Sequence, residues 1–149
     1  MSESINFTIE RMIFPEISFF YNPELKFSII DHKELEIDPE FFLKGDIYRH
    51  DPKTLFVTFS LSINLKTKEY PDYAKMHVAI IGKFITENTF TEEITKKMQA
   101  NFYAIIFPFL REAVFSLASR NNIELYLPIT NIFDMTQKRP EIFTITGFE

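Results

Sequence analysis

The fold is decided by residues 55–65, which read LFVTFSLSINL. Apolar side chains occupy every second position from Leu55 to Leu65, and Thr, Ser or Asn stands at most of the positions between them. Successive side chains of a strand point to opposite faces, so this pattern predicts a strand with one buried face and one polar face. Residues 74–80 repeat the alternation after a Tyr70-Pro71-Asp72 turn, and we expect the two segments to form an antiparallel hairpin.

The segments that flank this hairpin also alternate. An opening strand carries Ile5, Phe7 and Ile9 on one face, and a second extended piece follows Pro15, which marks a bulge or an edge position. The alternation is weaker from residue 25 to residue 48. Gly82, near the end of the strand region, predicts a bulge or a close approach of another element.

A helical pattern follows the strands. Thr89 and Glu92 fit a capping box at its start, and apolar residues then recur at helical spacing from residue 94 to residue 117. Pro108 lies inside this pattern and predicts a kink, or a restart near residues 101–104, because proline removes an intrahelical hydrogen bond. We expect the helix to end at residues 120–122, with an asparagine in the left-handed conformation as its cap.

The composition is that of one globular domain spanning residues 1–149, since no repeat or linker interrupts the chain. The 18 Phe and 6 Tyr exceed what so small a core can hide, so part of them should line an interface or a groove. A net charge of −5 argues against nucleic acid as a ligand. The absence of Cys excludes disulfides, thiolate metal sites and a Cys nucleophile.

The residues that carry catalysis are sparse. His32, His50 and His77 have no metal-ligand spacing, and three glycines cannot form a phosphate loop or a nucleophile elbow. We therefore expect no enzyme activity, no metal and no cofactor. The start of the chain has no secretory signal, and no apolar run approaches the roughly 18–20 residues of a membrane span. These features predict a cytoplasmic protein that does not insert into a membrane.

Residues 101–113, which read NFYAIIFPFLREA, resemble the helix signature of the SecB family of tetrameric bacterial export chaperones. Residues 7–11 with residues 17–19 resemble the first strand of that family, and residues 131–134 resemble its Val-Asn-Phe-Asp element with one residue inserted. The resemblance implies an α+β fold in which a four-stranded antiparallel sheet precedes a long helix. It also implies a homotetramer, a dimer of dimers with the long helices between the sheets.

The resemblance implies an ATP-independent holdase chaperone that binds unfolded or non-native polypeptides in an apolar groove. A dedicated client such as an antitoxin is one version of this role. Two alternatives stay open: a non-chaperone adaptor or assembly protein that keeps the fold, and a small-ligand enzyme built on sheet and helix. His77, beside Lys75, stands where the family has an acidic residue for the SecA motor, which argues against docking to SecA.

The resemblance also implies the residues of the groove, although most of them could equally be core. They are Phe19, Phe20, Tyr21, Ile123, Leu125, Tyr126, Leu127 and Phe133. The helix is apolar on more than one side, which predicts an oligomer interface. That interface would contain Phe102, Phe107, Phe109, Val114 and Phe115.

The C-terminal residues 141–149 depart from the family, because a strand-like tail replaces its second helix. This segment alternates β-branched and aromatic residues, as a strand does. Ile142, Phe143 and Ile145 should either add a strand to the sheet edge or lie in the groove in place of a client.

Overall fold

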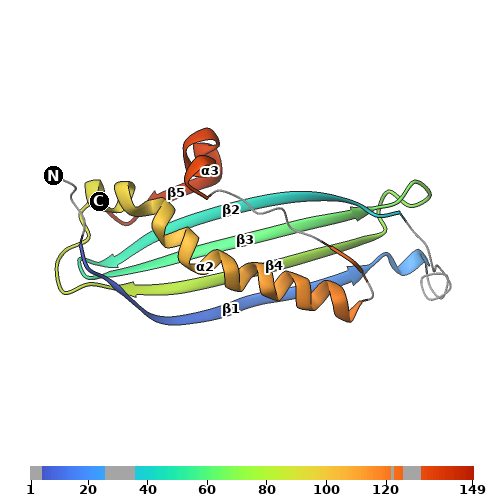
Figure 1. The fold of residues 1–149 in the computed structure, drawn as a ribbon, viewed down its shortest axis with the longest axis horizontal. Helices are drawn as coiled ribbons and strands as arrows, with labels where there is room; N and C mark the ends of the chain where they lie inside the picture. The colour runs from blue at the N-terminus through green and yellow to red at the C-terminus, as the bar shows by residue number, and fades with distance from the viewer. Residues whose placement is uncertain (1–4, 26–35, 122, 126–131) are drawn as a thin grey trace.

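A computed structural model describes residues 5–25, 36–121, 123–125 and 132–149. Its elements are β1 (Thr8–Tyr21), the 3-10 turn η1 (Pro23–Leu25), β2 (Asp38–Asp51), β3 (Thr54–Lys66), β4 (Ala74–Ile85), α2 (Glu92–Arg120), α3 (Ile132–Lys138), the 3-10 turn η2 (Pro140–Ile142) and β5 (Phe143–Thr146). The strands form one sheet in the order β1-β4-β3-β2-β5, and α2 lies along one face of it (Figure 1). The predicted sheet followed by a long helix is confirmed.

The hairpin of β3 and β4 forms the centre of the sheet. The two strands pair antiparallel, with Leu61 opposite Val78. The apolar row of β3, from Leu55 to Leu65, is at most 4% exposed, whereas the Ser, Thr and Asn side chains between them face the other side. The predicted buried and polar faces are therefore confirmed.

The edge strand β1 is one strand rather than the two expected pieces. It pairs antiparallel with β4 along its length, and its register shifts between Ile13 and Glu16, on either side of Pro15. The bulge predicted at Pro15 is confirmed. An edge strand tolerates proline because its outer N–H groups need no partner in the sheet.

The helix α2 ends at Arg120, as predicted, but its N-cap residue and the conformation of its C-cap differ from the expectation. The N-cap is Thr91, whose hydroxyl accepts a hydrogen bond from the Ile94 amide at 3.1 Å, so the capping box at Thr89 is wrong. The C-cap is Asn121 with a φ of −105°, which is not left-handed. Asn121 caps the helix with hydrogen bonds instead: its side-chain amide donates to the Leu117 carbonyl at 2.9 Å.

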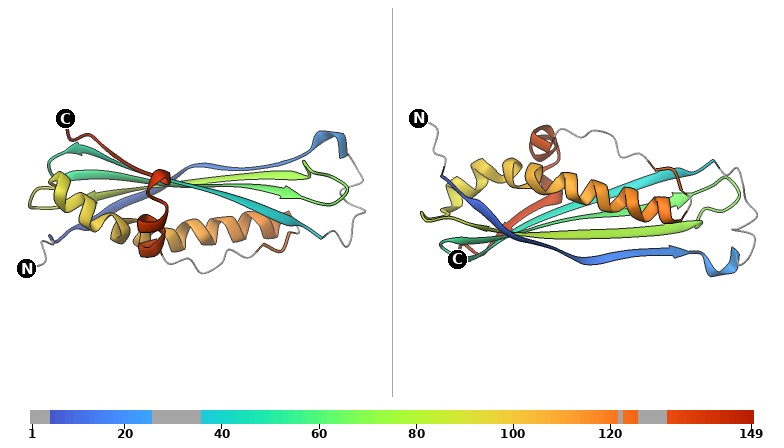
Figure 2. Two further views of the ribbon diagram at one scale, coloured as in Figure 1. Left: turned by 90° about the horizontal axis from the view of Figure 1, so that it is seen from above. Right: turned by 60° about the horizontal axis from the view of Figure 1, so that its bottom comes forward.

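The helix continues through Pro108 without a break, so the predicted restart is wrong. Figure 2 shows α2 curving over the sheet, with α3 on the same side. A Cβ on Gly82 would lie 3.1 Å from Ile106 Cγ2, which confirms the predicted close approach at this glycine. By length and mean hydropathy α2 could cross a membrane, contrary to the expectation from the sequence. Here it packs on the sheet through nine buried residues: Thr95, Met98, Ala100, Phe102, Tyr103, Ile106, Leu110, Val114 and Ala118.

The C-terminal segment contains a short second helix, which corrects the expectation that none remains. Residues Ile132–Lys138 form α3, and Pro140 prevents its extension because proline has no N–H to donate. The strand predicted for the tail is confirmed as β5, which pairs parallel with β2 at its edge. The sheet therefore has five strands, one more than predicted, and one of its pairs is parallel.

Gly45 of β2 leaves room for the C-terminal strand β5. A Cβ on Gly45 would lie 2.6 Å from Phe143 Cδ1 and 2.6 Å from Tyr103 Cζ. The missing side chain thus lets a ring from α2 and a ring from β5 meet over one backbone position.

We expect Gly45→Ala to lower the free energy of unfolding by about 1–3 kcal/mol, because overpacking a filled core displaces its neighbours. Urea denaturation followed by circular dichroism measures the change. Gly82→Ala is the control, since its Cβ would meet neighbours only at 3.0, 3.1 and 3.3 Å and should cost less. Equal stability of the parent and Gly45→Ala would contradict this account of the contact.

Candidate functional site

Three aromatic rings gather where β1 ends, on the sheet face that α2 covers. The β1–β4 register places Phe19 opposite Met76 and Tyr21 opposite Ala74, so both rings project to this face. The Phe19 and Tyr21 ring centroids lie 4.8 Å apart, and those of Tyr21 and Tyr73 lie 5.6 Å apart. Both pairs meet edge to face, which is a favourable geometry for aromatic rings. We call Phe19, Tyr21 and Tyr73 the aromatic cluster.

The aromatic cluster is tied to the end of α2. The Tyr21 hydroxyl donates a hydrogen bond to the Asn121 carbonyl at 2.8 Å. Burial, and secondarily the neighbouring Tyr73 phenol, raises the pKa of Tyr21. Burial also raises the pKa of Tyr73. Both hydroxyls therefore stay neutral at physiological pH. Phe19 and Tyr21 are half-buried and present uncharged rings, whereas Tyr73 is 5% exposed and belongs to the core.

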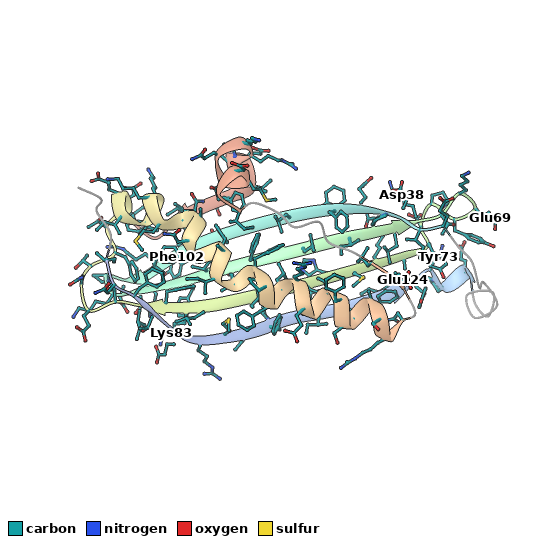
Figure 3. The ribbon with its side chains drawn as sticks, viewed as in Figure 1. Asp38, Glu69, Tyr73, Lys83, Phe102 and Glu124 are labelled. Carbon is teal, nitrogen blue, oxygen red and sulfur yellow. The ribbon has the colours of Figure 1, made fainter. Side chains whose placement is uncertain are left out.

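The structure separates the residues predicted for the groove. Phe19 and Tyr21 are half-buried, but Phe20 is 67% exposed and points to the opposite face of the sheet. Ile123 and Leu125 are each 5% exposed and belong to the core. Glu124, between them, lies toward the same end of the sheet as Tyr73 (Figure 3). The remaining three predictions are not tested: Tyr126 and Leu127 lie outside the described residues, as does the side chain of Phe133 on α3.

The residues predicted for an oligomer interface also divide. Phe102 and Val114 are 0% and 1% exposed and pack in the core of their own chain, so they offer no surface to a second copy. Phe107 and Phe115 are half-buried, and Phe109 is exposed. A depression of about 300 Å³ runs beside these side chains, lined by Phe107, Pro108, Arg111, Glu112 and Phe115.

The face of the sheet opposite α2, which we call the open face, carries cross-strand ion pairs beside the exposed rings of Phe20, Phe42 and Tyr48. Its carboxylates pair with bases across the strands: Glu40 with Lys66 at 2.8 Å, and Glu10 with Lys83 at 3.1 Å. His77 Nε2 lies 3.3 Å from Glu16. The open face therefore carries balanced charge rather than an acidic patch.

Ser62, His77 and Glu16 form a line on the open face, with Ser62 Oγ 2.7 Å from His77 Nδ1. A hydroxyl, an imidazole and a carboxylate are the groups of nucleophilic catalysis. This set lies on a flat surface, where the His77 and Glu16 side chains are 34% and 55% exposed. We interpret it as cross-strand pairing, because the register places Ser62 directly opposite His77. The described residues contain no group of three metal-ligating side chains.

Sequence reasoning missed several exposed or clustered apolar residues. Tyr73 lies between the predicted turn at residues 70–72 and the predicted strand from residue 74, and no role was predicted for it, although its ring completes the aromatic cluster. The Phe41-Phe42 pair was a usable signal, because adjacent strand residues face opposite sides and one ring must leave the core. The structure exposes Phe42 at 52% on the open face. The missed residues on β1 are Ile13, Phe14 and Ile17.

A solved structure matches most of the chain. The SecB-like chaperone Rv1957 of Mycobacterium tuberculosis, solved in complex with a ChAD peptide from the Rv1956 HigA1 antitoxin, superposes with a TM-score of 0.64. The two share 17% sequence identity over 83% of this chain and 90% of that chain. The chain has a SecB-like fold. The fold implied by the resemblance of residues 101–113 is therefore confirmed.

The match extends over nearly the whole length of that neighbour. A protein of unknown function from Streptococcus agalactiae covers 83% of this chain and 99% of its own at 10% identity, but its TM-score of 0.34 does not indicate a shared fold. No family model matches the sequence, and no curated protein matches it.

In this SecB-like fold we expect Tyr21→Phe to lower the free energy of unfolding by about 0.5–1.5 kcal/mol, because the variant leaves the Asn121 carbonyl without its donor. Urea denaturation measures the loss. Tyr48→Phe is the matched control, since Tyr48 is 45% exposed on the open face. Equal losses in the two variants would show that the bond to Asn121 adds nothing to stability.

Proposed function

We propose that this protein is an ATP-independent holdase chaperone that binds unfolded or non-native polypeptides. The observation that carries the proposal is the aromatic cluster, three touching rings beside the end of α2 in a SecB-like fold. The solved neighbour holds a peptide from an antitoxin, which supports a polypeptide as the class of ligand. A dedicated client such as an antitoxin is one form of this role.

Apolar rings suit a ligand of variable sequence. Hydrophobic contact is non-directional and contributes roughly 25 cal/mol per Å² of buried apolar surface, so a client needs exposed apolar residues rather than one motif. Ordering a flexible client opposes this gain, which leaves moderate affinity at each contact. Long clients that touch several surfaces at once bind more tightly. We expect such a holdase to act in the cytoplasm.

The open face does not support docking to SecA. His77 and Lys75 are basic side chains on it, and the nearby Glu16 carboxylate already pairs with His77 at 3.3 Å. A basic partner surface would meet little unpaired negative charge there. We therefore propose client binding without a SecA partner.

We expect the parent protein to suppress aggregation of heat-denatured citrate synthase without ATP, measured by light scattering. Phe19→Ser should weaken the suppression, because it removes a ring of the aromatic cluster. Phe20→Ser is the control, since that ring lies on the opposite face of the same strand. Circular dichroism verifies that both variants fold.

Aggregation at the control rate with stoichiometric parent protein would overturn the holdase and favour the adaptor alternative. Equal suppression by parent and Phe19→Ser would remove the aromatic cluster from the client surface.

We also propose a homotetramer, a dimer of dimers in which the outer faces of α2 meet. Ile105 and Phe109 support it, because they are 38% and 43% exposed on the side of the helix turned away from the sheet. Phe107 and Phe115 flank them. Ile13, Phe14 and Ile17 place further exposed apolar side chains along edge strand β1, where a second copy can pack.

Phe109→Asp should dissociate this assembly, because burying an unpaired carboxylate in an interface is strongly unfavourable. Light scattering coupled to size exclusion at micromolar concentration should then give a smaller mass than the parent. Phe42→Asp is the matched control, since Phe42 is similarly exposed but lies on the open face. A monomeric parent, or a Phe109→Asp variant with the parent mass, would contradict the helix-to-helix model.

A further inference from the structure

The edge of β2 carries a slot that the C-terminal strand fills. β5 pairs parallel with β2 over four positions, from Gly45 opposite Phe143 to Tyr48 opposite Thr146. Alternate residues of β5 point to opposite faces. Phe143 and Ile145 therefore face the α2 side, and Thr144 and Thr146 face the open side.

The deep part of the slot holds the Phe143 ring. Its centroid lies 4.8 Å from that of Tyr103 and 6.2 Å from that of Phe59, and the residue is only 7% exposed. Gly45 forms the floor, where a Cβ would lie 2.6 Å from Phe143 Cδ1. The slot thus accepts an aromatic side chain, followed two residues later by an aliphatic one beside Ile47.

Arg49 holds the far end of the tail. Its guanidinium lies 4.4 Å from the centroid of the Phe148 ring, and its Nε donates to the Gly147 carbonyl at 3.4 Å. Its Nη1 donates to the Phe90 carbonyl at 3.2 Å, just before α2 begins. Gly147 has a φ of +93°, and a Cβ there would collide with the Arg49 carbonyl oxygen. The contacts of Arg49 with the tail therefore depend on the backbone conformation at Gly147 as well as on the Phe148 side chain.

The fit of the tail is incomplete. The Tyr103 hydroxyl at the bottom of the slot is buried and has no hydrogen-bond partner among the described residues. β5 is only four residues long, and parallel pairing is slightly weaker per residue than antiparallel pairing. An incoming strand with an aromatic and an aliphatic residue at the positions of Phe143 and Ile145 would make the same contacts with β2. Replacing β5 by such a strand therefore requires no additional buried surface.

We propose that the β2 edge slot is a strand-accepting client site and that β5 is its built-in occupant, which a client must displace. The proposal rests on the holdase function proposed above. The ligand is an extended polypeptide segment that carries an aromatic residue, a polar residue and an aliphatic residue in succession. The Phe143-Thr144-Ile145 sequence of the tail itself defines this pattern.

A tethered occupant makes the slot selective for long clients. The tail is present at an effective concentration on the order of millimolar, so a short free peptide competes poorly with it. An unfolded chain that is already bound at the aromatic cluster gains the same advantage of tethering. The slot thus opens for clients that engage both surfaces and stays closed to isolated short segments.

A disulfide lock tests this exchange in the full-length chain, which contains no Cys. Tyr48 and Thr146 are register partners on the open face, so Tyr48→Cys combined with Thr146→Cys places two thiols across β2 and β5. The probe is fluorescein-labelled, carboxymethylated α-lactalbumin, and anisotropy gives its Kd. Oxidation should raise the Kd about tenfold or more over the reduced form, because a locked tail removes the open state.

The single variant Thr146→Cys is the control and should show no dependence on oxidation state. Phe143→Ser provides a second, independent test: it empties the deep part of the slot and should lower the Kd below that of the parent. Circular dichroism establishes that each variant is folded.

Equal Kd values for the oxidised and reduced double variant, with both forms binding the probe, would overturn the displaceable tail and leave the holdase intact. An unchanged or higher Kd for folded Phe143→Ser would also overturn it. If the parent, the reduced double variant and Phe143→Ser all fail to bind the probe, the holdase itself is wrong and the tail proposal is overturned with it.

Discussion

The structure depends on the packing of one helix against the centre of one sheet. Phe102, Ile106 and Leu110 of α2 are fully buried, as are Val57 and Phe59 of β3. A helix is about 10 Å wide and strands lie about 4.8 Å apart, so one helix can cover about two strands. α2 accordingly contacts β3 and β4 most and β1 less. The outer strands of the sheet keep apolar side chains that the helix does not reach, and these two margins hold the surfaces that can serve a partner.

The chain treats its two margins differently. At the β1 margin the rings of Phe19 and Tyr21 stay half-buried, tied to the end of α2 by a single hydroxyl. At the β2 margin the chain adds its own strand, and Phe143 enters the core between Phe59 and Tyr103. An uncovered strand edge invites pairing with other chains. The β1 margin is therefore open, whereas the β2 margin is covered by β5, a strand whose place another extended segment could take.

Sequence periodicity predicted the elements whose signals are local, and missed features that depend on distant contacts. The β3–β4 hairpin and the tail strand follow from alternation, which repeats within a few residues. The start of α2 was misplaced because Phe90 lies outside the helix, where its amide donates to the Pro52 carbonyl at 2.8 Å. Phe102 and Val114 were assigned to an interface because the buried stripe of the curved helix winds around it, so side chains on more than one side of the helix are still buried. The resemblance to the SecB family predicted the fold. It did not separate Phe19 from Phe20, because neighbouring residues of a strand point to opposite faces of the sheet.

A protein that leaves apolar rings accessible must still remain soluble, and the distribution of charge addresses this conflict. The open face balances its charges in cross-strand pairs such as Glu10 with Lys83 and Glu40 with Lys66. The chain as a whole keeps a net charge of −5, which favours solubility. At the β1 margin Phe19 and Tyr21 are held half-buried against their neighbours, whereas Phe20 on the same strand is 67% exposed. The α2 face thus stabilises the core, the paired charges of the open face favour solubility, and the two margins of the sheet offer surfaces for recognition.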